Sequence, residues 1–112
     1  MKIAIPTRDG KLCPHFGHCE EFAFLEIDPE TKRITRSEKA AAPAHEPGLL
    51  PRWLKKCGVE LVIAGGMGAR ALSLFADNGV EVIVGAPEAP PDQLAESYLD
   101  GRLKPGRNVC DH

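Results

Sequence analysis

The feature that most constrains the fold is a continuously apolar run, Leu61–Ala64, that leads into the glycine-rich turn Gly65–Gly68. A run with no polar side chain is typical of a strand buried on both faces of a sheet. The turn is expected to open a helix that continues to about Ala76, and a second buried strand is expected over Val80–Val84. This order of strand, helix and strand predicts an α/β fold with parallel strands.

The other periodic segments complete a single domain, residues 1–112, built on a mixed five-stranded sheet flanked by helices. The remaining strands are expected at Lys2–Ile5, Phe22–Ile27 and Arg33–Glu38, and the remaining helices at Leu49–Cys57 and from Pro90 to Gly101. The residues between the first two strands are expected to form a loop. The strands that begin near Ile3, Leu61 and Val80 should be parallel, so the loops that follow them should emerge at one rim of the sheet.

One loop carries the side chains whose chemistry is most informative about function: Cys13-Pro14-His15-Phe16-Gly17-His18-Cys19. Thiolate and imidazole groups bind soft and borderline metals. Cys13, His15, His18 and Cys19 are therefore candidate metal ligands, with His15 also a candidate cofactor-binding residue. The alternative is a tight turn whose cysteines and histidines only pack.

Three further residues are candidate metal ligands: His45, which should lie at the same rim, and Cys110 and His112, which end the chain. The spacing C-x5-C departs from that of structural zinc sites. A surplus of ligands suits an open, exchangeable site, while structural zinc remains an alternative. Cys57 falls on the apolar face of its helix and is assigned to the core.

The turn Gly66-x-Gly68-x-x-Ala71 formally fits a dinucleotide-binding fingerprint. The acidic residue expected at the end of the next strand is missing, which argues against a dinucleotide. Gly66, Gly68 and Arg70 are instead candidates for binding an anion at the start of a helix, and a turn with no ligand is the alternative. No serine elbow, P-loop or spaced carboxylate pair is present, so the chain is not expected to be an enzyme.

The net charge of −2 gives no electrostatic reason to expect nucleic acid or membrane as a partner. The first apolar run is cut short by Pro6 and Arg8 and does not read as a signal peptide. We therefore expect a cytoplasmic protein, in which cysteines serve as ligands or buried thiols more readily than as disulfides.

Four segments together resemble the nitrogenase iron-molybdenum cofactor accessory family, which includes the NifX-like proteins, a domain of NifB and the orange protein. They are Pro14–Phe22, Val62–Ala71, His45–Gly48 and Asn108–His112. The resemblance covers nearly the whole chain. It implies a ribonuclease-H-like fold and non-catalytic binding of metal-sulfur clusters, with His15 matching the histidine of the family's HFG motif.

These observations lead us to expect a carrier or scaffold for a metal-sulfur cluster of the iron-sulfur or molybdenum-iron type. Its partners would be cluster donor and recipient proteins, and a second copy of the chain in a homodimer. Two alternatives remain: a zinc-stabilised interaction domain, and a small nucleotide-binding or redox enzyme.

Overall fold

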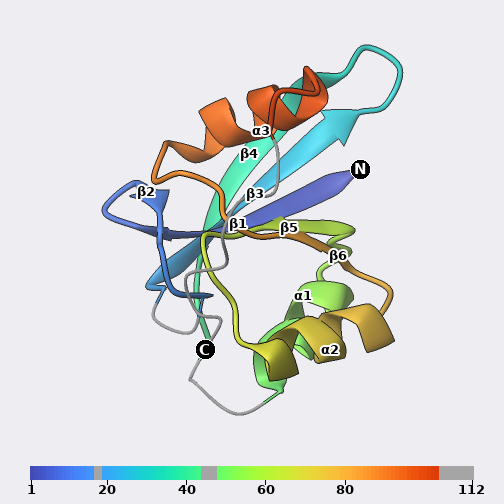
Figure 1. The fold of residues 1–112 in the computed structure, drawn as a ribbon. Helices are drawn as coiled ribbons and strands as arrows, with labels where there is room; N and C mark the ends of the chain where they lie inside the picture. Colours follow the sequence, from blue (N-terminus) through green and yellow to red (C-terminus); the bar gives the residue numbers. More distant parts are fainter. Residues whose placement is uncertain (17–18, 44–47, 104–112) are drawn as a thin grey trace.

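The computed structural model describes residues 1–16, 19–43 and 48–103, which form three layers (Figure 1). A twisted mixed sheet lies in the middle. Helices α1 and α2 cover one face of it and α3 covers the other. The structure confirms a mixed α/β domain, and the ribonuclease-H-like type stays a prediction.

The sheet has six strands in the described residues, in the order β4-β3-β1-β5-β6, with β2 paired to the end of β1. Their bounds are β1 Lys2–Arg8, β2 Lys11–Leu12, β3 Glu21–Asp28, β4 Arg33–Ala41, β5 Leu61–Ile63 and β6 Glu81–Ile83. As predicted, β1, β5 and β6 are mutually parallel. Strands β3 and β4 add to β1 in antiparallel fashion.

The sequence-based expectation of five strands was wrong, because the segment assigned to a loop begins with a hairpin. Strand β1 continues through Pro6 to Arg8, and Asp9 and Gly10 then reverse the chain into β2 with φ angles of 54° and 80°. An Asp-Gly pair with both φ angles positive is the sequence that two-residue hairpin turns favour. Pro6 is tolerated in β1 because it lies beyond Ile3 and Ala4, the residues that pair with β5.

The helices end close to where the sequence predicted. Helix α1 spans Leu49–Lys56, α2 spans Ala69–Asp77 and α3 spans Pro91–Leu99. Gly58, with φ 85°, follows α1 and lets the chain turn towards β5, as glycine does after many helices. Cys57 packs partly buried against the core on the α1 side, which confirms its assignment. Within the described residues, no helix is long and apolar enough to cross a membrane.

Two apolar clusters fill the layers on either side of the sheet. Phe22 and Phe24 of β3 face α1 and α2, whereas Leu25 and Ile27 of the same strand face α3. This alternation shows that both faces of β3 are covered. Most of the large side chains in the two clusters come from the sheet and helices, with Phe16 and Met67 added from loops, so the apolar packing does not depend on a bound metal.

We predict that removing metal leaves the fold intact. Dialysis against a chelator should change the thermal midpoint by less than about 2 °C, because the two cores account for the cooperative unfolding unit. Circular dichroism melting curves before and after chelation would measure this. A chelator that unfolds the domain would show instead that metal binding supplies the folding free energy, as it does in zinc fingers.

Candidate metal-binding site

The loop that carries the predicted ligands is tied at both ends to the last residues of β1. The backbone N–H of Cys13 donates to the carbonyl oxygen of Pro6 at 2.9 Å. At the other end the N–H of Glu20 donates to the carbonyl oxygen of Thr7 at 3.3 Å. Adjacent residues of one strand therefore fix the entry and the exit of the loop.

Thr7 is a residue that the sequence analysis did not single out. Its side chain is 1% exposed, and its hydroxyl donates to the carbonyl oxygen of Glu21 at 3.2 Å. This bond closes the end of β1 onto β3 directly beneath the loop. The signal that could have found it is a polar residue that follows the apolar run Ile3–Ile5 after a single proline.

The middle of the loop packs against the glycine-rich turn after β5. The N–H of Phe16 donates to the carbonyl oxygen of Gly66 at 3.0 Å. The Phe16 ring is buried and meets Phe22 and Phe75 edge to face, at centroid distances of 5.8 and 5.5 Å. Pro14 lies so close to Gly65 that a Cβ on the glycine would stand 3.1 Å from the Pro14 Cα. The loop and the turn are thus joined at the rim, as predicted from the parallel strands.

The three predicted ligands that lie in described residues differ in their surroundings. Cys13 is 2% exposed, and its Sγ donates to the carbonyl oxygen of His15 at 3.3 Å. The His15 side chain is exposed. Cys19 is half-buried beside the aromatic cluster. Burial raises the pKa of the Cys19 thiol to about 11, and repulsion from a Cys13 thiolate adds to the rise. At neutral pH Cys19 is therefore a thiol, and a metal must displace its proton.

The predicted anion-binding residues occupy the start of α2. Gly66 is buried beneath the loop, whereas Gly68 and Arg70 are exposed. No side chain caps α2, and its first turn contains no acidic residue. Its first N–H groups therefore carry the positive end of the helix dipole without a carboxylate to neutralise it.

The other predicted ligands, His18, His45, Cys110 and His112, lie outside the described residues. The end of β4, which precedes His45, does reach the same rim, because the N–H of Ala42 donates to the carbonyl oxygen of Glu20 at 3.0 Å. Within residues 1–16, 19–43 and 48–103, no three His, Cys, Asp or Glu side chains gather in a way that could hold a metal ion. The described part of the candidate site is thus a pair of thiols, Cys13 and Cys19, with His15 exposed on the same loop.

Comparison with known proteins finds similarity over nearly the whole chain. A model of the family described as dinitrogenase iron-molybdenum cofactor matches residues 1–101. The uncharacterised protein MJ0580 of Methanocaldococcus jannaschii is 34% identical over 107 residues, which are 93% of this chain and 90% of that protein.

Solved structures show the same fold. The crystal structure of PH0822 superposes with a TM-score of 0.84 at 30% identity and covers 93% of each chain. The apo form of the orange protein from Desulfovibrio gigas has a TM-score of 0.71 at 22% identity, over 96% of this chain and 93% of that one. At that identity the second likeness concerns the fold alone.

We predict that Gly65→Ser displaces the loop. Its Cβ would stand 3.1 Å from both the Cα and the carbonyl oxygen of Pro14, which are backbone atoms that cannot rotate away. We expect a loss of about 1–3 kcal/mol in the free energy of unfolding, measured by urea denaturation.

The matched control is Gly68→Ser, three residues along the same turn. A Cβ there meets nothing within 4 Å, and serine is favoured before the first residue of a helix. This variant should stay within about 0.5 kcal/mol of the parent. Equal destabilisation by both substitutions would contradict the close approach of loop and turn.

The raised pKa of Cys19 predicts slow alkylation of the metal-free protein. Burial disfavours the thiolate, so at pH 8 only about one Cys19 in a thousand is the reactive thiolate. The rate of iodoacetamide modification, followed by peptide mass spectrometry, should rise about tenfold per pH unit and still be rising at pH 10.

The same cysteine in the urea-unfolded chain is the control, because there its pKa returns to the ordinary value of 9.0 and its alkylation should level off above that pH. A folded-state profile that levels off at or below pH 9 would show that burial does not shift the thiol.

Proposed function

Because the chain belongs to the dinitrogenase iron-molybdenum cofactor family, we propose that it is a non-catalytic carrier or scaffold for a metal-sulfur cluster in the cytoplasm. The observation that carries the proposal is the hydrogen bond from Phe16 to Gly66. It joins the loop of cysteine and histidine residues to the uncapped start of α2. Soft ligands and anion-binding N–H groups thereby share one rim.

In this proposal Cys13 and Cys19 supply thiolates to the metal atoms of the cluster. His15, held between Pro14 and the buried Phe16, offers one directed imidazole bond from the surface of the loop. His18, His45, Cys110 and His112 are proposed as additional ligands.

The N-terminal end of α2 would hold the anionic part of the cluster. Metal-sulfur clusters with thiolate ligands carry net negative charge, which backbone N–H groups and a helix dipole stabilise. Gly68, where a Cβ would meet nothing within 4 Å, leaves space for close approach of the cluster, and Arg70 in the first turn of α2 adds a positive charge. Gly66 would contribute through its backbone beneath the loop.

The cluster is cargo in this proposal, and not a part of the fold. The apolar cores are complete without it, and each thiol must lose a proton before it can bind metal. Such a site can release its metal when a recipient protein supplies stronger ligands. Its partners are therefore cluster donor and recipient proteins, among them those that assemble iron-molybdenum or iron-sulfur cofactors.

Anaerobic reconstitution with iron and sulfide, with and without molybdate, tests the proposal. The parent should gain visible absorption together with stoichiometric iron and sulfide. Cys13→Ser and Cys19→Ser should each lower retention of the cluster on a desalting column at least tenfold, because each removes a thiolate. His15→Ala should lose cluster transfer to an apo-acceptor or retention of the cluster.

Two variants serve as controls. Cys57→Ser removes a thiol that packs at the other end of the sheet, after α1, and should keep full cluster retention. Phe16→Ala should lower the free energy of unfolding by about 3–5 kcal/mol, because it leaves a cavity beside Phe22 and Phe75. A parent protein that binds one colourless zinc ion and no sulfide would contradict the proposal and favour a zinc-stabilised interaction domain.

A further inference from the structure

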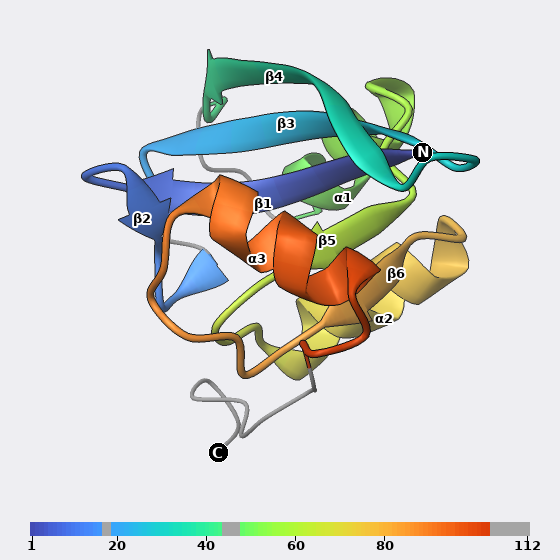
Figure 2. The same cartoon turned by 90° about the horizontal axis from the view of Figure 1, so that it is seen from above.

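Strand β4 forms one outer edge of the sheet, and its second side pairs with no strand in the described residues (Figure 2). It is nine residues long, whereas β6 at the opposite edge has three. Seven of the nine β4 residues are exposed, and Ile34 and Ala40 are half-buried. A strand edge of this length is a template for pairing with another strand.

The hydrogen-bond register shows which β4 backbone groups point outwards. Met1 and Ile27 exchange a pair of bonds, of 3.1 and 2.8 Å, so Ile27 and every second residue before it bond to β1. The intervening residues of β3 bond to β4, where Phe24 is paired with Glu38. The N–H and C=O groups of Ser37 and Lys39, which alternate with that pair, therefore face away from the sheet.

Charge selects one register for antiparallel pairing of two copies. A two-fold axis at Arg36, Glu38 or Lys39 would place that charged residue opposite its own copy, which is destabilising. An axis at Ser37 places a hydroxyl opposite a hydroxyl. It also places Arg36 of each copy opposite Glu38 of the other. A two-fold axis nearer to either end of β4 would leave fewer residues paired between the two copies.

We propose that β4 is the contact surface of a homodimer, in which two copies pair antiparallel about Ser37 and form one continuous sheet. Arg36 and Glu38 already form an ion pair within one chain, with side chains 65% and 47% exposed. In the dimer the two pairs combine into a ring of four alternating charges. The outward backbone groups of Ser37 bond to those of its copy.

The α3 face of the sheet offers a second complementary contact. Lys39 is paired with Ala23, which alternates with the α1-facing Phe22 and Phe24, so Lys39 lies on the α3 side. In the proposed register Lys39 of one copy lies opposite Thr35 of the other. Just beyond Thr35 is a groove of about 420 Å³ between α3 and the start of β4.

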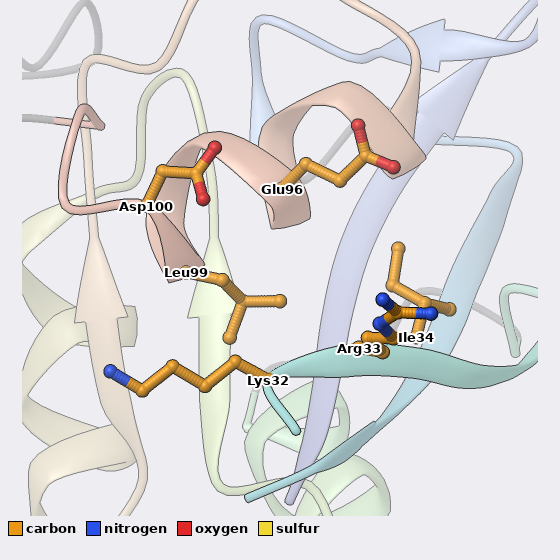
Figure 3. Close-up of a pocket in the computed structure, with 6 residues that line it drawn as sticks. All are labelled: Lys32, Arg33, Ile34, Glu96, Leu99 and Asp100. Atoms are coloured by element: carbon orange, nitrogen blue, oxygen red, sulfur yellow. The ribbon is translucent and has the colours of Figure 1, made fainter. Parts of the chain in front are cut away.

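Carboxylates from α3 and from the residue after it line this groove together with cations near the start of β4 (Figure 3). Its lining residues are Lys32, Arg33, Ile34, Glu96, Leu99 and Asp100. Asp100 pairs with Arg102, whereas Glu96 has no ion-pair partner within the part of the chain that the structure describes. Lys39 of the second copy supplies a cation on the Glu96 side of the groove.

The ladder is short, because a β-bulge interrupts the β3–β4 register between Glu26 and Ile27 and bends β4 near Thr35. Pairing is therefore confined to about five residues of β4 from each copy, and the dimer should form only at high protein concentration. The axis lies about 16 Å from Ala42 along the strand, so the metal-binding loops remain uncovered at opposite ends of the dimer.

Charge reversal tests this arrangement. Sedimentation of the parent, from about 10 µM to about 1 mM, should show a monomer–dimer equilibrium that weakens as salt rises. Arg36→Glu and Glu38→Arg should each be monomeric over that range, because each puts like charges across the interface. An equimolar mixture of the two single variants should dimerise again, because one variant then presents two carboxylates to the two guanidinium groups of the other.

Two further variants separate this interface from other contacts. Glu81→Arg reverses an exposed charge on β6 at the opposite edge and should leave the association unchanged. Glu96→Lys should weaken it at least threefold, because a like charge then faces Lys39 of the second copy. A parent that stays monomeric at 1 mM, or a mixture that fails to restore the dimer, would overturn the proposal.

Discussion

The rest of the structure depends on β1 bonding to other segments on both of its sides. Strand β3 pairs with it along one side, and β5 and then β2 pair with it along the other. Strand β5 pairs with the first half of β1, and β2 pairs with its last residues. The end of β1 therefore remains part of the sheet beyond the residues that pair with β5. Those residues provide the carbonyl groups that hold the candidate metal-binding loop. The central strand therefore places the two ends of the loop, and Phe16 fixes its middle against the turn after β5.

The burial of the thiols sets the chemistry of this loop. A half-buried Cys19 beside Cys13 resists ionisation, since a thiolate there loses hydration and faces a second thiolate. In the proposed carrier, metal uptake would consequently be coupled to proton release, and the affinity for metal would fall as the pH falls. Such coupling would suit the proposed carrier role, because the proton that returns to each thiol favours release of the metal.

Much of the fold could be predicted from the sequence, because apolar runs and glycine turns report burial directly. The buried run Leu61–Ala64 and the turn after it predicted parallel strands and the rim where their loops meet. The hairpin at Asp9 and Gly10 was missed, although an Asp-Gly pair is a strong turn signal, because β2 is only two residues long and shows no alternation.

The site was harder to predict than the fold. Residue type alone made Cys13, His15 and Cys19 candidates, but it could not show that Cys13 is buried and bonded to the loop backbone. Nor could it show the role of Thr7, because a buried hydroxyl acquires its partner only when β1 and β3 pair. Burial and tertiary hydrogen bonds arise from contacts between segments distant in sequence, which a local pattern does not contain.

The attachment of the loop to two adjacent residues has a consequence for how such proteins diverge. Since Cys13 and Glu20 bond to Pro6 and Thr7, the ends of the loop stay together whatever lies between them. Apart from Phe16, which packs in the core, the side chains in that interval can be exchanged, and residues can be added or removed, at an entropic cost that grows only slowly with loop length. One scaffold can thereby carry loops of different sequence and length, while the strand that holds them remains the same.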